Sequence, residues 1–114
     1  LTKIQADDLL TIIFTSGSTG DPKGVMLTQH NISTNVEAIN QIFRFTNQDT
    51  ILGILPFFHS FGFTGNLWLS LTRGMGITYH VSPLDARVIG KLCKKYKGTI
   101  LISTPTFLRT YIKR

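Results

Sequence analysis

The chain has 114 residues, of which 42% are hydrophobic and 16% charged, and it carries a net charge of +6. This length allows one domain at most, and the low charged fraction predicts a surface that is partly covered by other protein. The single cysteine excludes a disulfide framework and a cysteine zinc site, and it fits a reducing compartment. Because the chain begins at Leu1 and stops at Arg114, we expect one incomplete domain, a piece of a larger protein.

The first half of the chain is predicted to hold two strands, a loop and a helix. The β-branched apolar run Leu9–Phe14 predicts a buried strand. Residues 15–24 form a loop by composition, and Val25–Leu27 forms a second short strand. Thr28 is a suitable N-cap for a helix that reaches Phe45.

The second half is predicted to alternate apolar strands with helices. Strands are expected at 51–55, 76–81 and 99–102, and helices at 61–71, from Ser82-Pro83 onward and from Pro105 onward. The uncharged stretch from 50 to 72 has only 12 apolar residues in 23, which is too few for a membrane span. Apolar strands that alternate with helices predict an α/β fold, with a mostly parallel sheet and helices on both faces.

The C-terminal end is strongly basic. Residues 86–114 contain eight Lys and Arg side chains and no acid. Such a block can bind nucleic acid or an anionic membrane, but among the lysines it has only Tyr96 as a stacking aromatic. We interpret it as a solvated helix face or a contact for an acidic carrier protein, and we expect no nucleic-acid binding.

The segment from 15 to 24 carries the chemistry. It combines four hydroxyl side chains, three glycines and Lys23 directly after a strand. Glycines let backbone N–H groups surround an anion, while hydroxyls and a lysine add donors and charge, so the loop predicts a polyphosphate site. A Walker A loop is excluded because Gly24, rather than Ser or Thr, follows Lys23. The only Gly-x-Gly, at 74–76, lacks the third glycine of a dinucleotide fingerprint.

Residues 14–24 (FTSGSTGDPKG) resemble the phosphate-binding signature of the adenylate-forming (AMP-binding) superfamily of acyl-CoA synthetases, luciferases and peptide-synthetase adenylation domains. Residues 28–31 and 55–62 (LPFFHSFG) resemble two further motifs of that family. The resemblance is closest to the bacterial acyl-ACP synthetase / 2-acylglycerophosphoethanolamine acyltransferase branch, through residues 59–64, 81–84 and 104–108. It implies that residues 1–114 are part of the large N-terminal AMP-binding domain.

The resemblance also implies two groups of site residues. The first would bind the β- and γ-phosphates of ATP, with Mg²⁺, and consists of Thr15, Ser16, Gly17, Ser18, Thr19, Gly20 and Lys23. The second would form the acyl and carboxylate pocket and consists of Phe58, His59, Phe61 and Gly62. The family's adenine, ribose and magnesium residues and its C-terminal lysine have no match in the sequence, so we expect no complete catalytic set and no metal ligand in residues 1–114. We predict that these residues alone form no acyl-AMP.

The implied function is that of an ATP-dependent ligase that activates a fatty acid as acyl-AMP and passes the acyl group to a thiol. The thiol would belong to acyl-carrier protein or coenzyme A, and the product could feed lysophospholipid acylation. Further expected partners are the rest of the adenylation domain and a C-terminal domain. The expected location is cytoplasmic, including the cytoplasmic face of a bacterial inner membrane. The alternative is a non-catalytic phosphate- or nucleotide-binding module. A third hypothesis, a nucleic-acid-binding domain that uses the basic end, is the one that we do not favour.

Overall fold

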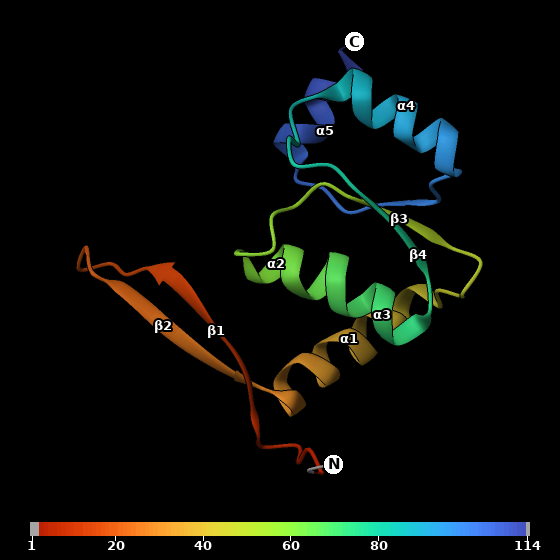
Figure 1. Cartoon of the computed structure of the whole chain (residues 1–114). Coiled ribbons are helices and arrows are strands. Elements are labelled where there is room, and N and C mark those ends of the chain that lie inside the picture. Colours follow the sequence, from red (N-terminus) through yellow and green to blue (C-terminus); the bar gives the residue numbers. More distant parts are fainter. Residues whose placement is uncertain (1–2, 114) are drawn as a thin grey trace. The chain divides into compact units, whose positions relative to one another are not determined.

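A computed structural model describes residues 3–113 of the chain (Figure 1). Its internal contacts divide the chain into two compact units, Leu1–Phe43 and Arg44–Arg114. The predicted glycine-rich loop belongs to the first unit, and the predicted parallel sheet belongs to the second.

The first unit begins with a β-hairpin. Strand β1 (Leu9–Ser16) pairs antiparallel with β2 (Pro22–Thr28), and the last pair of the ladder is Ser16 with Pro22. The prediction of a buried first strand is wrong for most of its side chains: Ile13 is 7% exposed, but Phe14 is 69% exposed. A two-stranded ribbon has no layer of its own to cover it, so an apolar run alone does not bury such a strand.

Helix α1 (Gln29–Phe43) follows the hairpin and is capped as predicted. The Thr28 hydroxyl accepts a hydrogen bond from the Asn31 N–H at 3.2 Å, and the Asn31 side-chain oxygen accepts one from the Thr28 N–H at 2.9 Å. This reciprocal pair satisfies two backbone donors that a helix start leaves without partners. The helix buries Ile32 and Val36, and it ends two residues before the predicted Phe45.

The second unit is built on a three-stranded sheet. Strand β3 (Thr50–Gly53) lies between β4 (Gly76–Tyr79) and β5 (Ile100–Leu101), and it is parallel to both. This arrangement confirms the predicted parallel α/β sheet, although each strand is shorter than the sequence indicates. The chain after β3 stays buried through Leu55, without belonging to the ladder.

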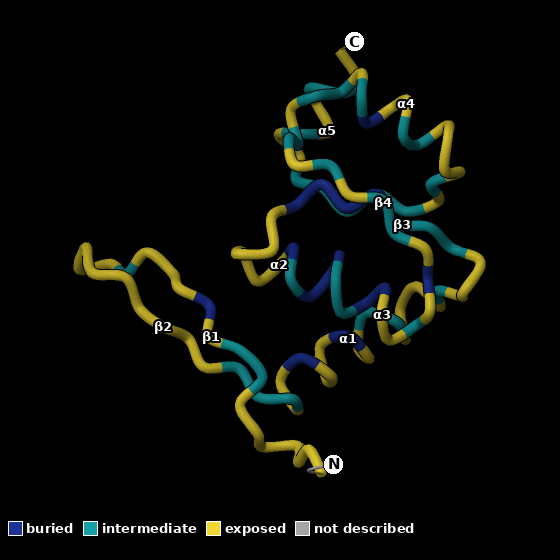
Figure 2. The backbone as a smooth tube through the Cα atoms, in the orientation of Figure 1, coloured by how far each residue is buried: buried dark blue, intermediate teal, exposed yellow. Residues whose placement is uncertain are grey.

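Helices cover both faces of this sheet (Figure 1). Helices α4 (Ala86–Tyr96) and α5 (Pro105–Ile112) lie on one side. A continuous helical segment lies on the other, formed by α2 (Ser60–Gly62), the π-helix η1 (Phe63–Trp68) and α3 (Leu69–Arg73). One apolar cluster of this unit consists of the buried Leu52, Ile54, Leu55 and Ile89. Figure 2 colours the backbone of the unit by burial. No helix within residues 3–113 is long and apolar enough to cross a membrane.

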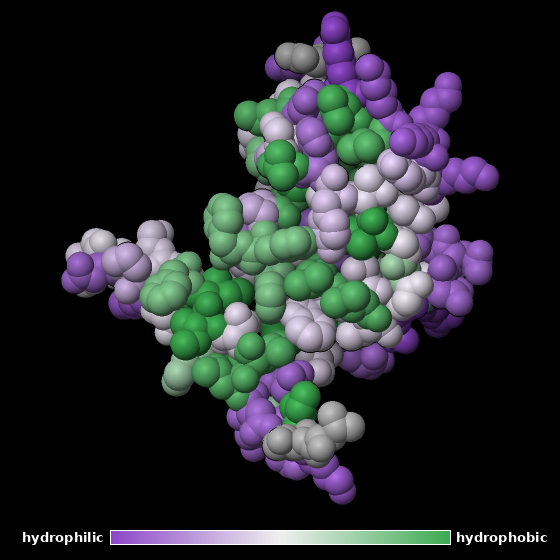
Figure 3. Space-filling view, in the orientation of Figure 1, coloured by the Kyte–Doolittle hydropathy of each residue, from purple (hydrophilic) through white to green (hydrophobic). Residues whose placement is uncertain are grey.

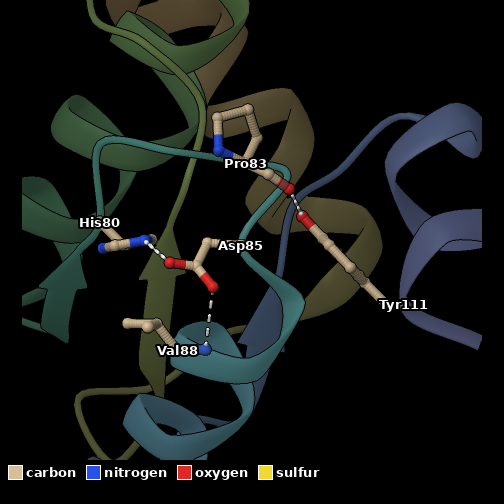
Figure 4. Close-up of polar contacts among 5 residues, drawn as sticks. All are labelled: His80, Pro83, Asp85, Val88 and Tyr111. Carbon is tan, nitrogen blue, oxygen red and sulfur yellow. Dashed lines mark hydrogen bonds and ion pairs between the residues drawn. The ribbon is translucent and has the colours of Figure 1, made fainter. Parts of the chain in front are cut away.

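Helix α4 begins at Ala86 and not at the predicted Ser82-Pro83 (Figure 4). Asp85 caps it, because one carboxylate oxygen accepts the Val88 N–H at 3.4 Å. His80 Nε2 lies 3.6 Å from the other oxygen of Asp85, and the Tyr111 hydroxyl donates to the Pro83 carbonyl. Aspartate is a strong N-cap, so the helix starts after Asp85, while Pro83 stays in the preceding turn.

The basic block lies on exposed surface. The lysines and arginines at 87, 91, 94, 95, 97, 109 and 113 are all exposed. Figure 3 shows hydrophilic side chains projecting around α4. Lys95 Nζ lies 4.9 Å from the centre of the Tyr96 ring, a cation–π contact within one helix. The basic block is therefore exposed in the structure, and the contact with an acidic carrier protein stays a prediction.

Asp49 directly precedes β3, and it is hydrogen-bonded to the start of β4 and to the residue before β5. Its carboxylate accepts the Thr46 N–H at 2.9 Å and the Thr99 hydroxyl at 2.9 Å, and its carbonyl accepts the Gly76 N–H at 3.1 Å. The Thr46 N–H, followed by the Thr99 hydroxyl, holds the pKa of Asp49 below its ordinary value of 3.8. Asp49 therefore stabilises the folded state above that value, and the stabilisation is lost as the pH falls through the lowered pKa.

Replacing Asp49 by Asn should reduce the pH dependence of stability. We expect the free energy of unfolding of Asp49→Asn to fall below wild type at pH 7, and the difference to narrow as the pH drops from about 5 to about 2. Urea unfolding at several pH values measures this. Thr99→Val removes one of the donors to the Asp49 carboxylate, so its free energy of unfolding should depend less on pH than that of wild type. A gap that stays constant over the whole range would refute this role of Asp49.

Candidate active site

The glycine-rich loop is the tip of the β1–β2 hairpin. Residues 17–21 connect the strands, and the Gly20 N–H donates to the Gly17 carbonyl at 3.1 Å, which closes the turn. Gly20 has φ +91°, a backbone conformation that side-chain-bearing residues rarely adopt. Ser18 and Thr19 are exposed at the tip. The tip of the loop therefore exposes hydroxyl-bearing residues to solvent.

The register of the two strands places Lys23 beside this loop. It lies opposite Thr15 in the ladder, next to the Ser16–Pro22 pair that ends it. A β-carbon added at Gly17 would lie 3.3 Å from Lys23 Cε and 2.5 Å from the Asp21 carbonyl oxygen, so the lysine stem and the far side of the loop both approach Gly17 closely. The hairpin thus brings together all seven residues of the predicted phosphate group.

This donor set fits the phosphates of ATP. The seven loop residues contribute four hydroxyls, one ammonium group and the N–H groups of a tight turn, and these are the groups that bind phosphate oxygens. The fit to Mg²⁺ is different. Within residues 3–113 no three His, Cys, Asp or Glu side chains are grouped so that they could hold a metal ion. Mg²⁺ is commonly bound through substrate phosphates with one or two carboxylates, so any ion at this loop would depend mainly on the phosphates.

The close approach at Gly17 makes a prediction about ATP binding. Gly17→Ala would place a methyl group against the Asp21 carbonyl oxygen, so the turn would have to open. We expect kcat/KM for ATP to fall roughly 10- to 100-fold, because a displacement of about 1 Å is enough to cost that much. Steady-state kinetics of the full-length protein measure it. The KM for the carboxylic acid should stay close to wild type, and an unchanged kcat/KM for ATP would contradict the packing seen in this loop.

The second predicted group surrounds the turn that leads into α2. His59 is exposed and caps this helix: its Nδ1 accepts the Phe61 N–H at 3.2 Å. The His59 N–H donates to the Pro56 carbonyl at 3.2 Å, and the Phe63 N–H donates to the His59 carbonyl at 2.9 Å. Since Nδ1 accepts, the neutral imidazole carries its proton on Nε2. The turn therefore leaves Nε2–H as the donor of His59 that has no hydrogen-bond partner among residues 3–113.

The aromatic side chains of this group face solvent. Phe58 is 81% exposed and Phe61 is 46% exposed. Phe57 packs edge-to-face on Tyr79 of the neighbouring strand, with ring centres 4.9 Å apart. Burial raises the pKa of Tyr79. Parallel strands β3 and β4 point their carboxyl ends toward this region, which is where α/β sheets commonly bind ligands.

Gly62 differs from its neighbours because it is buried. A β-carbon at Gly62 would lie 2.2 Å from the Pro56 carbonyl oxygen and 2.9 Å from the Leu55 carbonyl oxygen. The glycine thus lets the start of the helical segment pack directly on the chain leaving β3. This contact holds the His59 turn in place, a role that we assign to Gly62 in addition to the predicted pocket.

Sequence reasoning missed Asn66. It is fully buried in η1, and its side-chain N–H donates to the Leu55 carbonyl at 3.2 Å. The signal in the sequence was a polar amide side chain within the uncharged stretch from 50 to 72. The π-helical turn that directs it inward, in which the Leu69 N–H bonds the Thr64 carbonyl five residues back, has no recognisable sequence pattern.

A donor-rich hairpin loop and a parallel sheet with helices on both faces are typical of α/β proteins that bind nucleotide phosphates. A family model described as "AMP-binding enzyme" matches residues 1–114. The chain belongs to the AMP-binding enzyme family.

Known relatives agree with this assignment. The chain is 33% identical over 109 residues to an oxalate–CoA ligase of Arabidopsis thaliana, covering 95% of the chain and 21% of the relative. It is 32% identical over 115 residues to 4-coumarate–CoA ligase 4 of the same plant, covering 97% and 20%. The chain therefore spans about a fifth of the length of the curated relatives that it matches.

Solved structures show the same fold. The o-succinylbenzoate CoA synthetase MenE of Bacillus subtilis, in complex with its acyl-adenylate intermediate, superposes with a TM-score of 0.89 at 28% identity, over 97% of this chain and 29% of that one. Another structure of MenE contains ATP and a magnesium ion. ATP-bound MatB of Rhodopseudomonas palustris gives a TM-score of 0.83 at 30% identity, over 96% and 21%. The predicted superfamily and its fold are confirmed, whereas the acyl-ACP synthetase branch stays a prediction.

Proposed function

We propose that residues 1–114 are the phosphate-binding and carboxylate-presenting part of an ATP-dependent acid–thiol ligase, within a large AMP-binding domain. The observation that carries this proposal is the hairpin loop, in which a tight glycine turn, exposed hydroxyls and the Lys23 stem are brought together. Family membership and the ligase relatives support it.

The loop would act on the leaving group. When a carboxylate attacks the α-phosphorus of ATP, negative charge develops on the departing pyrophosphate. Backbone N–H groups and hydroxyls of residues 15–20, together with the Lys23 ammonium, are donors that stabilise such charge without reorganising. Mg²⁺ bound to the phosphates supplies further positive charge.

The His59 turn would act on the acid. The free Nε2–H of His59 is a donor that can hold a carboxylate oxygen, while the Phe61 N–H keeps the imidazole in that tautomer. The exposed rings of Phe58 and Phe61 flank the turn with apolar surface. No Lys, Arg, Asp or Glu occurs between 50 and 72. The turn therefore fits a monocarboxylic acid with an apolar tail, and we propose a fatty acid.

The thiol acceptor belongs to the proposal as well. The named relatives are CoA ligases, which supports coenzyme A as the acceptor. The acyl-ACP synthetase alternative, with lysophospholipid acylation downstream and a site at the cytoplasmic face of the inner membrane, rests on the resemblance of residues 59–64, 81–84 and 104–108. Turnover with coenzyme A compared with turnover with acyl-carrier protein decides between them.

Product analysis tests the proposal. The full-length protein, given ATP, Mg²⁺ and a series of straight-chain fatty acids without thiol, should form pyrophosphate and a mass-detectable acyl-AMP. Adding coenzyme A should convert this intermediate to acyl-CoA and AMP. Tight ATP binding without acid-dependent turnover would instead identify a non-catalytic nucleotide-binding module. The separate peptide of residues 1–114 should form no acyl-AMP, because the adenine- and ribose-binding residues expected for the family are not in it.

A further inference from the structure

The buried amide of Asn66 holds the chain where it leaves β3. Its side-chain N–H donates to the Leu55 carbonyl at 3.2 Å, and its exposed fraction is 0%. Leu55 is also buried, beyond the last ladder pair of β3, so its carbonyl needs a partner from elsewhere. Asn66 supplies that partner from the opposite layer, across eleven residues of chain.

The π-helix gives Asn66 this orientation. In η1 the Leu69 N–H bonds the Thr64 carbonyl, five residues back, and the three consecutive residues Thr64, Gly65 and Asn66 are all buried. An α-helix turns by about 100° per residue, so three adjacent inward positions are unusual for it. Such a wide turn is rare in proteins, and where it occurs it frequently lies at a functional site. The Ser70 hydroxyl donates to the Asn66 carbonyl at 2.8 Å and thereby supports the widened turn.

The carbonyl that Asn66 holds lies just before the His59 turn. Pro56 follows Leu55, and the Pro56 carbonyl accepts the His59 N–H at 3.2 Å. His59 Nδ1 in turn accepts the Phe61 N–H, which sets the tautomer and the direction of Nε2. A continuous series of contacts thus runs from a buried amide to the exposed imidazole. The Asn66 side-chain oxygen has no hydrogen-bond partner among the described residues, so its bond to Leu55 is what fixes the amide.

We propose that Asn66 is a positioning residue for His59: by holding the Leu55 carbonyl, it fixes the turn from which His59 presents Nε2–H to the carboxylate of the substrate. The part that concerns the carboxylate rests on the proposed ligase function. The part that concerns the His59 imidazole does not, and it can be measured without turnover.

Asn66→Leu tests this, since leucine has nearly the same shape as asparagine but no donor. In the full-length protein with ¹⁵N-labelled histidine, wild-type His59 should show an unprotonated Nδ1 and a protonated Nε2, and Asn66→Leu should shift it toward the tautomer mixture of a free imidazole. The KM for the fatty acid should rise about 10- to 100-fold, as for a displaced binding group, with the KM for ATP within about twofold of wild type.

Thr72→Val is the control, because the Thr72 hydroxyl makes the same kind of bond in the same helical segment, to the Trp68 carbonyl at 2.8 Å, and bonds neither Asn66 nor Leu55. It should leave the His59 signals and the KM for the acid near wild type. If Asn66→Leu does not fold, Asn66→Ala replaces it, with room for a water at the carbonyl. An unchanged His59 spectrum in a folded Asn66 variant would overturn the proposal. Absence of acid-dependent turnover in the wild type would overturn only the ligase function.

Discussion

Lys23→Ala is expected to abolish most acyl-adenylate formation. The ammonium group is the only positive charge in the segment from 15 to 24, and the hairpin register delivers it to the phosphate loop. Removing a donor that stabilises developing charge lowers kcat by about 100- to 1,000-fold. ATP–pyrophosphate exchange that depends on a fatty acid measures the adenylation step separately from thiol transfer.

The control for Lys23 is another exposed lysine. Lys91→Ala removes the same charge from the basic face of α4, outside the phosphate loop. Its exchange rate should equal that of wild type, so a loss at Lys23 cannot be explained by net charge. If Lys23→Ala retained more than about half of the wild-type exchange, where a loss of 100-fold or more is expected, the phosphate role of this loop would have to be abandoned.

Gly62→Ala should destabilise the folded protein strongly. The added methyl group would lie 2.2 Å from the Pro56 carbonyl oxygen, which is backbone and cannot rotate away. Overpacking of this kind costs about 1–3 kcal/mol, and at such a distance we expect the upper part of that range. The urea midpoint of the full-length protein should fall accordingly, and activity should fall with it because the His59 turn must move.

Gly90→Ala provides the matched control for Gly62. A β-carbon at Gly90 would meet nothing within 4 Å, and the residue lies inside α4. Alanine is favoured over glycine in a helix interior by about 1 kcal/mol, so this variant should be more stable than wild type. A Gly62→Ala variant as stable as wild type would mean that the chain from Leu55 to Pro56 does not pack on the helical segment as described.

The position of the hairpin loop could be predicted from the sequence because its residues are local, whereas its phosphate-binding role stays a prediction. The hydroxyls, glycines and Lys23 are consecutive, and a hairpin of short strands brings them together without help from distant residues. Thr28 as a helix cap and Pro105 as a helix start were predictable for the same reason. The parallel order of β4, β3 and β5 followed from apolar strands that alternate with helices.

What the sequence could not predict depends on tertiary contacts. The apolar residues of β1 indicated burial, but Phe14 is largely exposed because a two-stranded hairpin does not cover its own faces. Helix α4 begins at Ala86 because the Asp85 carboxylate competes successfully with Ser82-Pro83 as the start. Periodicity does not reveal Asn66 or the π-helix, since an extra residue in one turn offsets the apolar pattern after it from the pattern before it, and no residue type marks where that happens.

The central claim is that the protein activates a carboxylic acid as acyl-AMP. It is tested most directly by following an ¹⁸O label from the carboxylate of the acid into the products. The full-length protein is given ATP, Mg²⁺, coenzyme A and a fatty acid whose carboxylate carries ¹⁸O in both positions. If the carboxylate attacks the α-phosphorus and the thiol then displaces AMP from the acyl group, one ¹⁸O must leave with the phosphate of AMP. Mass spectrometry should therefore find AMP heavier by one ¹⁸O and pyrophosphate without label. Label in inorganic phosphate, or AMP without label, would contradict the proposed ligase mechanism.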